Sequence, residues 1–429
     1  MPDQALYERI SQEVDRREEE ILDVVRQLLR IPTATPPGEN YDQMVALMLP
    51  YFQQIGFTAE RIDMPEAVFE ERCRSYYPQM QGVRSNLLAK LHVGAEEGVL
   101  WYAHFDTVPV DPSLWSVPPY EGVVKEGKIW GRGTSDAKGE CAAAICAFRI
   151  LHALGIEPRY NVTVALTSDE EIGPYSGLMY LADLGRFDDC HYFHSLDGGS
   201  DRISIGANGT LTWTITVRGK SVHSGSSFLG VNPIEHSHTL FAELLALKEQ
   251  VGTRRSAMPA PADLAQETGI STIRPVFNIT MARGGLKHNI IPPEFVIEGD
   301  RRFIPEEDEE EVRREIQAAV DRARARDPQL DCTLKINPVY TSFFSDPHHP
   351  WPRKVQEVVR FVTGEEINIC GSQGSTDVAY TVKKTGLVSA SFGVGRARES
   401  NGHGVDENAR ISDILNLVKV ICTLATKAV

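Results

Sequence analysis

Val99-Leu100-Trp101-Tyr102-Ala103-His104-Phe105-Asp106 is a run of apolar residues that closes on a histidine and an aspartate. The apolar part predicts a strand, and His104 lies at the end of it. Asp106 follows two positions later, on the same face if the strand continues. A carboxylate there is placed to hold the second imidazole nitrogen, as the outer partner of a metal-bound histidine usually does.

Helical and strand patterns alternate on both sides of this run. We expect helices over 6–29, 40–54 and 138–154, strands over 86–91, 99–103, 162–167 and 192–196, and a short helix after Gly173. Such alternation predicts a mostly parallel sheet covered by helices on both faces. In sheets of this kind, ligands bind beyond the carboxyl ends of the strands.

The pattern changes at about Gly209. Strands are expected over 210–217, 276–281, 295–303 and 332–336, and helices over 233–250 and 306–326. This β-α-β-β-α-β order is the split, ferredoxin-like arrangement, which suits an inserted domain. We therefore predict that residues 1–208 and 341–429 form one domain and residues 209–340 a second. The returning segment has helices over 352–363 and 411–426.

Composition narrows the possible functions. A chain of 429 residues exceeds a usual single core, which agrees with two domains. The formal net charge of -15 argues against nucleic acid or an anionic membrane as a partner. Seven scattered cysteines without a Cys-x-x-Cys pair, and a polar N-terminus without an apolar signal core, favour a cytoplasmic protein with reduced thiols.

The remaining candidate residues also lie at or just after expected strand ends. Asp136 closes the glycine-rich turn 131–136, Glu170 and Glu171 follow the strand ending at Thr167, Asp197 follows the strand over 192–196, and His403 precedes the last helix. Together with His104 they predict a two-metal hydrolase centre. If His104 and Asp197 bind one ion, Glu171 and His403 a second, and Asp136 both, each ion has one imidazole and two carboxylates, with room for a bridging water. Two divalent ions with three carboxylate ligands have a net charge of +1. This charge favours deprotonation of the bridging water to hydroxide near neutral pH.

Glu170 and Glu171 are adjacent, and neighbours in an extended segment point in opposite directions. Only one of them is then easily a ligand. We assign Glu171 to the metal and Glu170 to general base catalysis, in which it takes the proton of the water and passes it to a leaving nitrogen.

Four segments carry a resemblance to a known family. They are Ala103-His104-Phe105-Asp106-Thr107-Val108-Pro109, Gly131-Arg132-Gly133-Thr134-Ser135-Asp136-Ala137-Lys138-Gly139, Ser168-Asp169-Glu170-Glu171-Ile172-Gly173 and Gly402-His403-Gly404. The chain resembles, over nearly its whole length, the metallopeptidase and deacylase family of acetylornithine deacetylase, succinyl-diaminopimelate desuccinylase, aminoacylase-1 and carboxypeptidase G. The resemblance implies an α/β fold with a zinc-peptidase-like catalytic domain and an inserted ferredoxin-like α+β lid and dimerisation domain. It also implies the ligand scheme above, Glu170 as the base, and a homodimer or larger homo-oligomer formed through the insert.

The same resemblance implies further site residues. His223, in Gly219-Lys220-Ser221-Val222-His223, is similar to the insert histidine that stabilises the oxyanion, often in the partner subunit's site. Asn278 and Asn289 resemble asparagines near that pocket. Asp300-Arg301-Arg302 resembles the segment whose arginine pairs with a substrate carboxylate, and we choose Arg302 over Arg301. Gly374 and Ser375, in Ser372-Gln373-Gly374-Ser375-Thr376-Asp377, resemble the loop whose N–H groups contact that carboxylate.

One segment departs from the family pattern. Many of its deacylases have Glu-Pro at the third terminal ligand, whereas this chain has Asp197-Gly198. Aspartate still suits a metal, but the departure removes a cue for the acetylornithine or succinyl-diaminopimelate substrates.

These patterns predict a hydrolase with two divalent ions per subunit (zinc, cobalt or manganese) that cleaves the C–N amide bond of a small carboxylate-bearing substrate. One alternative is a hydrolytic deaminase of an aromatic amino acid such as an aminobenzoate, for which Trp101, Tyr102, Phe343 and Phe344 are candidate pocket residues. A catalytically silent binding protein on the same fold is an alternative of another class. The sequence leaves open whether the substrate is an acyl amino acid, a dipeptide or an aromatic amine. His191 and His194 lie in the strand before Asp197 and are expected to be packing residues.

Overall fold

The computed structural model describes residues 3–426, which form two compact units. The first, here the α/β unit, comprises Met1–Gly206, Ser345–Gly371 and Tyr380–Val429. The second, here the insert unit, comprises Ala207–Phe344 and Ser372–Ala379. The insert unit therefore also includes the short loop that follows residue 371.

A mixed sheet forms the core of the α/β unit. Its strands lie in the order β1-β2-β6-β3-β7-β15-β8, with β14 beside β8. Strands β6, β3, β7 and β15 are parallel, while β1, β2 and β8 pair antiparallel at the two sides. Strand β3 is buried throughout, because apolar residues fill both of its faces. The bounds are β1 Thr58–Asp63, β2 Ser85–Leu91, β3 Gly98–His104, β6 Asn161–Thr167, β7 Tyr192–Ser195, β8 Arg202–Ala207, β14 Asn368–Ser372 and β15 Val388–Ser391.

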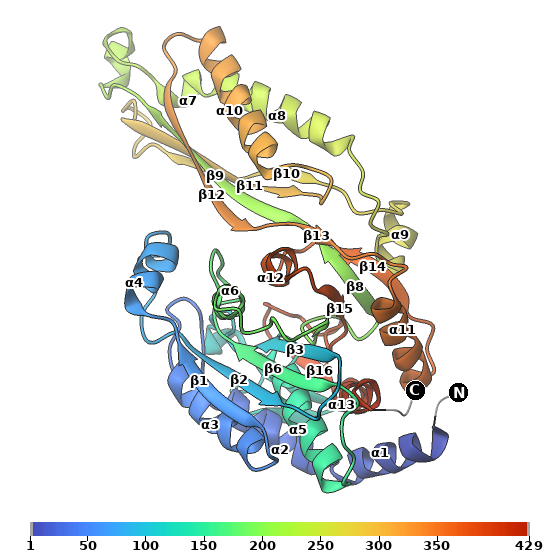
Figure 1. Cartoon of the computed structure of the whole chain (residues 1–429). Helices are drawn as coiled ribbons and strands as arrows, with labels where there is room; N and C mark the ends of the chain where they lie inside the picture. Colours follow the sequence, from blue (N-terminus) through green and yellow to red (C-terminus); the bar gives the residue numbers. More distant parts are fainter. Residues whose placement is uncertain (1–2, 427–429) are drawn as a thin grey trace. The chain divides into compact units, whose positions relative to one another are not determined.

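Helices cover this sheet. Figure 1 shows α2, α3 and α5 below the sheet and α6 above it. Helix α5 is buried along almost its whole length, and its alanines allow close packing against β3 and α13. The bounds are α1 Gln4–Arg16, α2 Glu18–Leu29, α3 Tyr41–Gln53, α4 Glu66–Phe69, α5 Lys138–Ala153, α6 Gly177–Asp183, α11 Pro350–Thr363, α12 Val378–Thr385 and α13 Ile411–Ala425.

A small antiparallel sheet joins two distant segments of the α/β unit. It has the order β16-β5-β4, with bounds β4 Val123–Lys125, β5 Lys128–Trp130 and β16 Asn408–Arg410. Glu126 and Gly127 connect β4 to β5, both with positive φ, as a tight two-residue hairpin turn requires. Because β16 pairs with β5, the segment after His403 lies beside the turn that contains Asp136.

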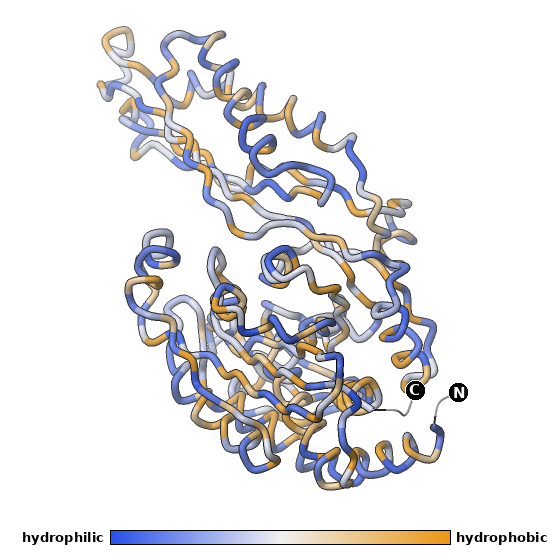
Figure 2. The backbone as a smooth tube through the Cα atoms, viewed as in Figure 1, coloured by the Kyte–Doolittle hydropathy of each residue, from blue (hydrophilic) through white to orange (hydrophobic). Residues whose placement is uncertain are grey.

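The insert unit is a four-stranded antiparallel sheet with helices. Its strand order is β10-β11-β9-β12, the ferredoxin-like order that the pattern predicted. The bounds are β9 Gly209–Arg218, α7 Pro233–His236, α8 His238–Gly252, α9 Ala262–Thr268, β10 Val276–Gly284, β11 Glu294–Phe303, α10 Glu309–Arg326, β12 Asp331–Tyr340 and β13 Phe343–Phe344. Helix α10 is mostly hydrophilic (Figure 2) and buries only the stripe that contains Val312, Ile316 and Val320.

The predicted fold class is confirmed: a mostly parallel sheet with helices and an insert of ferredoxin-like topology. Some predicted elements differ in detail. The helix predicted over 6–29 is two helices that meet at Arg17, and the helix over 233–250 is broken at Ser237. In residues 3–426, no helix has both the length and the apolar character needed to cross a membrane.

The aromatic residues considered for a pocket need a correction. Trp101 and Tyr102 are fully buried in β3, where Trp101 packs edge-on against Phe148 and His194. Phe343 is also buried. Trp101 and Tyr102 are packing residues, because a strand inside a parallel sheet has core on both faces.

Candidate metal centre

Asp136 lies between the two candidate histidines. Its Oδ1 is 3.0 Å from His104 Nε2, and its Oδ2 is 3.1 Å from His403 Nε2. Each carboxylate oxygen thus faces a different imidazole, although the two histidines are almost 300 positions apart in the sequence. This is the arrangement that a shared ligand of two ions needs.

Two groups of potential ligands meet at Asp136. His104, Asp136 and Asp197 can bring one ligand atom each within 4.8 Å of one another, and so can Asp136, Glu171 and His403. His403 Nε2 is 2.8 Å from Glu171 Oε2, while the buried Glu171 Oε1 has no hydrogen-bond partner among residues 3–426. A buried carboxylate oxygen without a partner is unfavourable unless a cation accompanies it. The donors, imidazole nitrogen and carboxylate oxygen, fit divalent zinc, cobalt or manganese.

Burial, neighbouring charges and hydrogen bonds shift the pKa values of these groups. Burial, together with the charge of Asp136, raises the pKa of Glu171 to about 7, and burial raises that of Asp197 to about 6. Hydrogen bonds with Asp136 and Glu171 raise the pKa of His403 to about 11. The cluster therefore holds more negative charge than its surroundings stabilise, and positive charge is favoured between the carboxylates.

Glu407 fixes the glycine-rich turn that carries Asp136. Its buried carboxylate accepts hydrogen bonds from Gly133 N at 3.0 Å, Ser135 N at 2.9 Å and Arg132 Nη1 at 2.6 Å. Gly133 has a φ of +93°, a conformation that favours glycine. Because Glu407 follows His403 by four residues, it ties the two ligand-bearing segments together. Sequence reasoning missed Glu407; the signal was an acidic residue just after Gly402-His403-Gly404.

Asp106 lies at the second nitrogen of His104, as predicted, and has further contacts that the sequence did not indicate. Strand β3 ends at His104, so Asp106 lies beyond it. Its Oδ1 accepts from Glu170 N at 3.2 Å and its Oδ2 from Glu171 N at 3.1 Å. His104 Nδ1 is 3.1 Å from the Asp106 backbone oxygen and 3.4 Å from Oδ1. Asp106 thus contacts the histidine and also organises the Glu170–Glu171 backbone.

Residues 170–172 form a turn, which differs from the extended segment assumed in the sequence analysis. Asp169 precedes this turn with a φ of +67°, and its buried carboxylate points to Arg84 Nη1 at 3.0 Å and Tyr41 Oη at 2.9 Å. Arg84 is itself buried and also donates to Gly38 O at 2.7 Å. Sequence reasoning missed this network, since no local pattern links Tyr41, Arg84 and Asp169.

The insert unit brings three of the predicted substrate residues together. Arg302 Nη1 donates to Ser375 Oγ at 3.3 Å, and Asp300 links Arg302 with Asn278 at 3.6 Å and 3.2 Å. Gly374 is the neighbour of Ser375, and its N–H donates to Ser372 Oγ. Arg301 is buried and donates to Glu307 at 2.5 Å, whereas the Arg302 side chain is partly exposed.

His223 and Asn289 form a separate pair in the insert unit. Ser224 N donates to Asn289 O at 2.9 Å, and an isolated bridge joins His223 to Ile290. This pair lies beyond the Arg218 end of β9, whereas Arg302 pairs with Thr210 at the other end. Eight strand residues separate the two ends by roughly 26 Å. Within one insert unit, His223 and Arg302 are therefore not part of one site.

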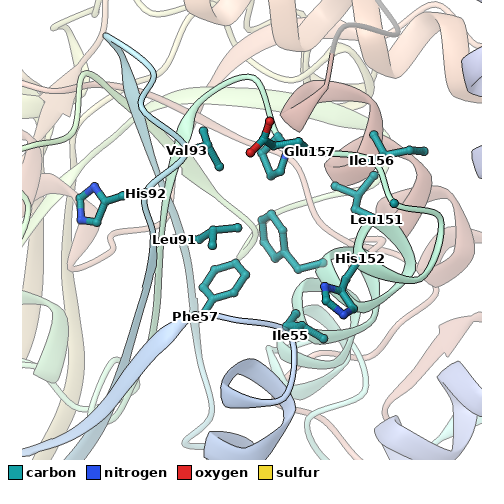
Figure 3. Close-up of a pocket in the computed structure, with 12 residues that line it drawn as sticks. Ile55, Phe57, Leu91, His92, Val93, Leu151, His152, Ile156 and Glu157 are labelled. Carbon is teal, nitrogen blue, oxygen red and sulfur yellow. The ribbon is translucent and has the colours of Figure 1, made fainter.

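One cavity of the α/β unit lies at the candidate ligands. Another cavity of this unit has a different lining. The first includes Asp136 and Asp197 in its lining. The second (Figure 3) has the large apolar side chains of Phe57, Leu91 and Leu151 around it, with His92 pointing away. None of the predicted site residues lines this second cavity, so the chemistry is expected at the first.

Comparison with known proteins agrees with this geometry. Residues 100–427 match the model of peptidase family M20/M25/M40. The chain is 28% identical over 403 residues to a succinyl-diaminopimelate desuccinylase of Delftia acidovorans, covering 92% of this chain and 94% of the relative. It is 25% identical over 438 residues to an N-formyl-4-amino-5-aminomethyl-2-methylpyrimidine deformylase of Halalkalibacterium halodurans, covering 98% and 96%.

Among solved structures, human carnosine dipeptidase 1 superposes with a TM-score of 0.78 at 17% identity, covering 100% of this chain and 99% of that one. The di-peptidase Dug1p of Saccharomyces cerevisiae gives a TM-score of 0.79 at 16% identity, with the same coverage. These likenesses show the fold. With the family model matched over residues 100–427, the chain belongs to peptidase family M20/M25/M40, a family of metal-dependent hydrolases.

Proposed function

We propose that this chain is a metal-dependent hydrolase that cleaves the C–N amide bond of a small carboxylate-bearing substrate. One observation carries the proposal: the two oxygens of Asp136 face two histidines, and each histidine has a further carboxylate within reach. Relatives named as a desuccinylase and a deformylase support amide cleavage.

The ligand assignment follows from these groups. His104 and Asp197 would hold one divalent ion, His403 and Glu171 a second, and Asp136 both. Bound ions would supply Lewis-acid polarisation of the amide carbonyl and would make the attacking water more acidic. Zinc, cobalt and manganese all suit these donors.

Glu170 is proposed as the general base. It is buried next to Glu171, and Asp106 fixes the backbone of both residues. In that position its carboxylate would take a proton from the attacking water and give it to the leaving nitrogen. The carbonyl carbon then gains one oxygen as the C–N bond breaks, and the products are a carboxylate and an amine.

Arg302 and the loop of Gly374 and Ser375 are proposed to contact the substrate carboxylate. The support is the Arg302 to Ser375 hydrogen bond and the guanidinium's exposure. Asn278 is held by Asp300 beside them and would position the substrate by hydrogen bonding.

We further propose that the insert unit is a lid and a dimerisation domain. Phe228 and Leu286, in segments near His223 and Asn289, are 82% and 92% exposed. Large apolar side chains with this degree of exposure are candidates for burial in a protein interface. His223 and Asn289 would then serve a second subunit, which fits their distance from Arg302 along β9.

The test is hydrolysis of N-acyl amino acids and dipeptides by protein loaded with Zn²⁺, Co²⁺ or Mn²⁺. We expect two ions per chain by elemental analysis and loss of activity with a chelator. Glu170→Gln should keep both ions and lose activity by about 100-fold or more. Full activity of Glu170→Gln, or of the metal-free protein, would refute the proposal. Ammonia release from an aminobenzoate without amide cleavage would instead establish the deaminase alternative.

A further inference from the structure

The cavity beside the candidate metal ligands has a defined chemical character. Its volume is about 250 Å³, enough for several water molecules or a short chain. Its lining consists of four glycines, two serines, one alanine, two aspartates and two arginines. The aspartates are Asp136 and Asp197, so a group that enters the cavity is next to the scissile bond. Every lining residue belongs to the α/β unit.

The lining offers no large apolar or aromatic side chain for a ligand to pack against. Its one apolar side chain is the methyl of Ala397. The cavity of Figure 3 differs in this respect, because large phenylalanine, leucine and isoleucine side chains contribute to its lining. A small cavity walled by glycines and short side chains, with arginine at its edge, suits a short chain that ends in a polar group.

Arg396 is held rigidly in this wall. Its Nε and Nη2 donate to Asp413 at 2.6 Å and 3.0 Å, and Asp413 is 4% exposed. Ser200 Oγ also donates to Asp413 at 3.1 Å, which fixes the carboxylate. The Arg396 backbone N–H donates to Ser400 Oγ, so the loop around it is fixed as well. A guanidinium held at one edge loses little further entropy when it binds a ligand.

The second edge of that guanidinium remains available. A guanidinium has five N–H donors, and the pair with Asp413 uses only the Nε–Nη2 edge. Nη1 has no acceptor among residues 3–426. The edge formed by Nη1 and Nη2 matches the two oxygens of a carboxylate. Arg202 lies in the same wall, where it donates to the carboxylate of Asp201 at 2.7 Å and 3.1 Å.

We propose that this cavity binds a second substrate carboxylate, on a short chain next to the scissile amide, and that Arg396 recognises it. The inference rests on the proposed function and names its substrate class: a dicarboxylate in which the carboxylate assigned to Arg302 is the other acid. The chain bearing the second carboxylate is attached either to the acyl carbon or to the leaving nitrogen.

Matched substrate pairs distinguish these two positions. On the acyl side, an N-succinyl amino acid is compared with the N-butanoyl derivative, which has a methyl group in place of the carboxylate. On the amine side, N-acetylglutamate is compared with N-acetylnorvaline. In one of the two pairs, we expect kcat/KM to be about 10- to 100-fold higher for the substrate with the second carboxylate. A hydrogen bond between charged groups contributes free energy of this size.

Arg396→Gln should remove that preference, so that the two substrates of the pair have similar values of kcat/KM. Because this change leaves the buried Asp413 without its cation, the double variant Arg396→Gln/Asp413→Asn is the better-folding form, checked by its melting temperature. Ala397→Leu keeps the Arg396 pair and narrows the cavity, so it should lower kcat/KM for the preferred acid. Arg398 is an exposed arginine of the same loop and lies outside the cavity lining. Arg398→Gln is therefore the matched control and should leave kcat/KM unchanged for both substrates.

Calorimetric binding of succinate and butanoate to metal-loaded protein gives a readout that is independent of turnover. Succinate should bind more tightly, and the double variant should lose the difference. Equal rates within both pairs, or a folded double variant that keeps its preference, would overturn the inference and leave the proposed function standing. Failure to hydrolyse any of the four substrates with metal present would count against the proposed function itself.

Discussion

At the scale of single residues, Asp106 shows how one carboxylate serves several groups. It accepts hydrogen bonds from the backbone N–H groups of Glu170 and Glu171 and lies beside His104. Asp106→Ala should therefore misplace the base and a ligand at once, and lower kcat by about 10- to 100-fold. The measurement is steady-state kinetics with metal content determined in parallel.

Asp111→Ala is the control for that change. Asp111 is exposed and caps only the short turn at Ser113, with a bond of 3.0 Å. Its removal should leave kcat unchanged. Wild-type kcat in Asp106→Ala would contradict the positioning role.

His194 gives a prediction about pH. It is fully buried, both ring nitrogens lack a hydrogen-bond partner within the described part of the chain, and burial lowers its pKa to about 3. The unfolded chain takes up a proton at this histidine below about pH 6.5, but the folded protein does not until about pH 3. Its contribution to stability is complete above pH 6.5 and is lost as the pH falls, by about 2 kcal/mol at pH 5.

His194→Phe removes this acid sensitivity and keeps a ring between Trp101 and Trp351. The loss of unfolding free energy between pH 7 and pH 5 should be about 2 kcal/mol smaller in the variant, measured by urea unfolding. Other histidines titrate in both proteins, so the difference isolates His194. An identical loss in both proteins would mean that His194 is not buried in its neutral form.

At the scale of elements, Glu407 connects the turn before α5 with the segment leading into β16. Glu407→Ala would leave the buried Arg132 without its carboxylate and would free the Gly133 and Ser135 N–H groups. We expect a loss of about 3–5 kcal/mol in stability and reduced metal occupancy, since the Asp136 and His403 segments separate. Differential scanning calorimetry and elemental analysis measure the two effects.

Glu399→Ala breaks an exposed pair with Arg410 in the same region, and should cost less than about 1 kcal/mol. If Glu407→Ala has no larger effect than this control, Glu407 is not the anchor of the turn.

Sequence patterns predicted the elements that have strong periodicity. Strand β3 and helix α5 were placed within one or two residues, because a buried strand and an alanine-rich helix are visible in local sequence. The break at Arg17 was missed, since the apolar positions continue across it. The short strands β4, β5 and β16 were also missed, because three residues carry too little pattern to predict a strand.

Site residues could be predicted only where metal-binding residue types occur at strand ends or in glycine-rich turns. His104, Asp136 and His403 are unusual residues at strand ends or in glycine-rich turns, and the structure brings them together. Arg84 and Asp169 pair across 85 positions inside the core. Nothing local distinguishes such a pair from ordinary surface charges, so only the folded chain shows that it holds the Glu170 turn.

At the scale of the whole molecule, the insert unit has its predicted substrate residues at two separate places. Arg302, Ser375 and Asn278 lie near the Thr210 end of β9, and His223 with Asn289 lies beyond the other end. A homodimer resolves this separation if each insert unit contributes its His223 to the other subunit. The exposed Phe228 and Leu286 would then be covered by the partner, and Phe228→Asp/Leu286→Asp should yield monomers in light scattering.

Mixing two inactive variants tests whether His223 acts across subunits. In a dimer of Glu170→Ala with His223→Ala, one site combines the intact Glu170 of one chain with the intact His223 of the other. If His223 acts on the partner, mixing and reassociation should restore roughly a quarter of wild-type activity, because half of the dimers are mixed and each has one complete site. If His223 acts within its own chain, no site is complete and no activity returns. Adding Phe228→Asp/Leu286→Asp to both variants should abolish the recovery, since the restored site exists only in the dimer.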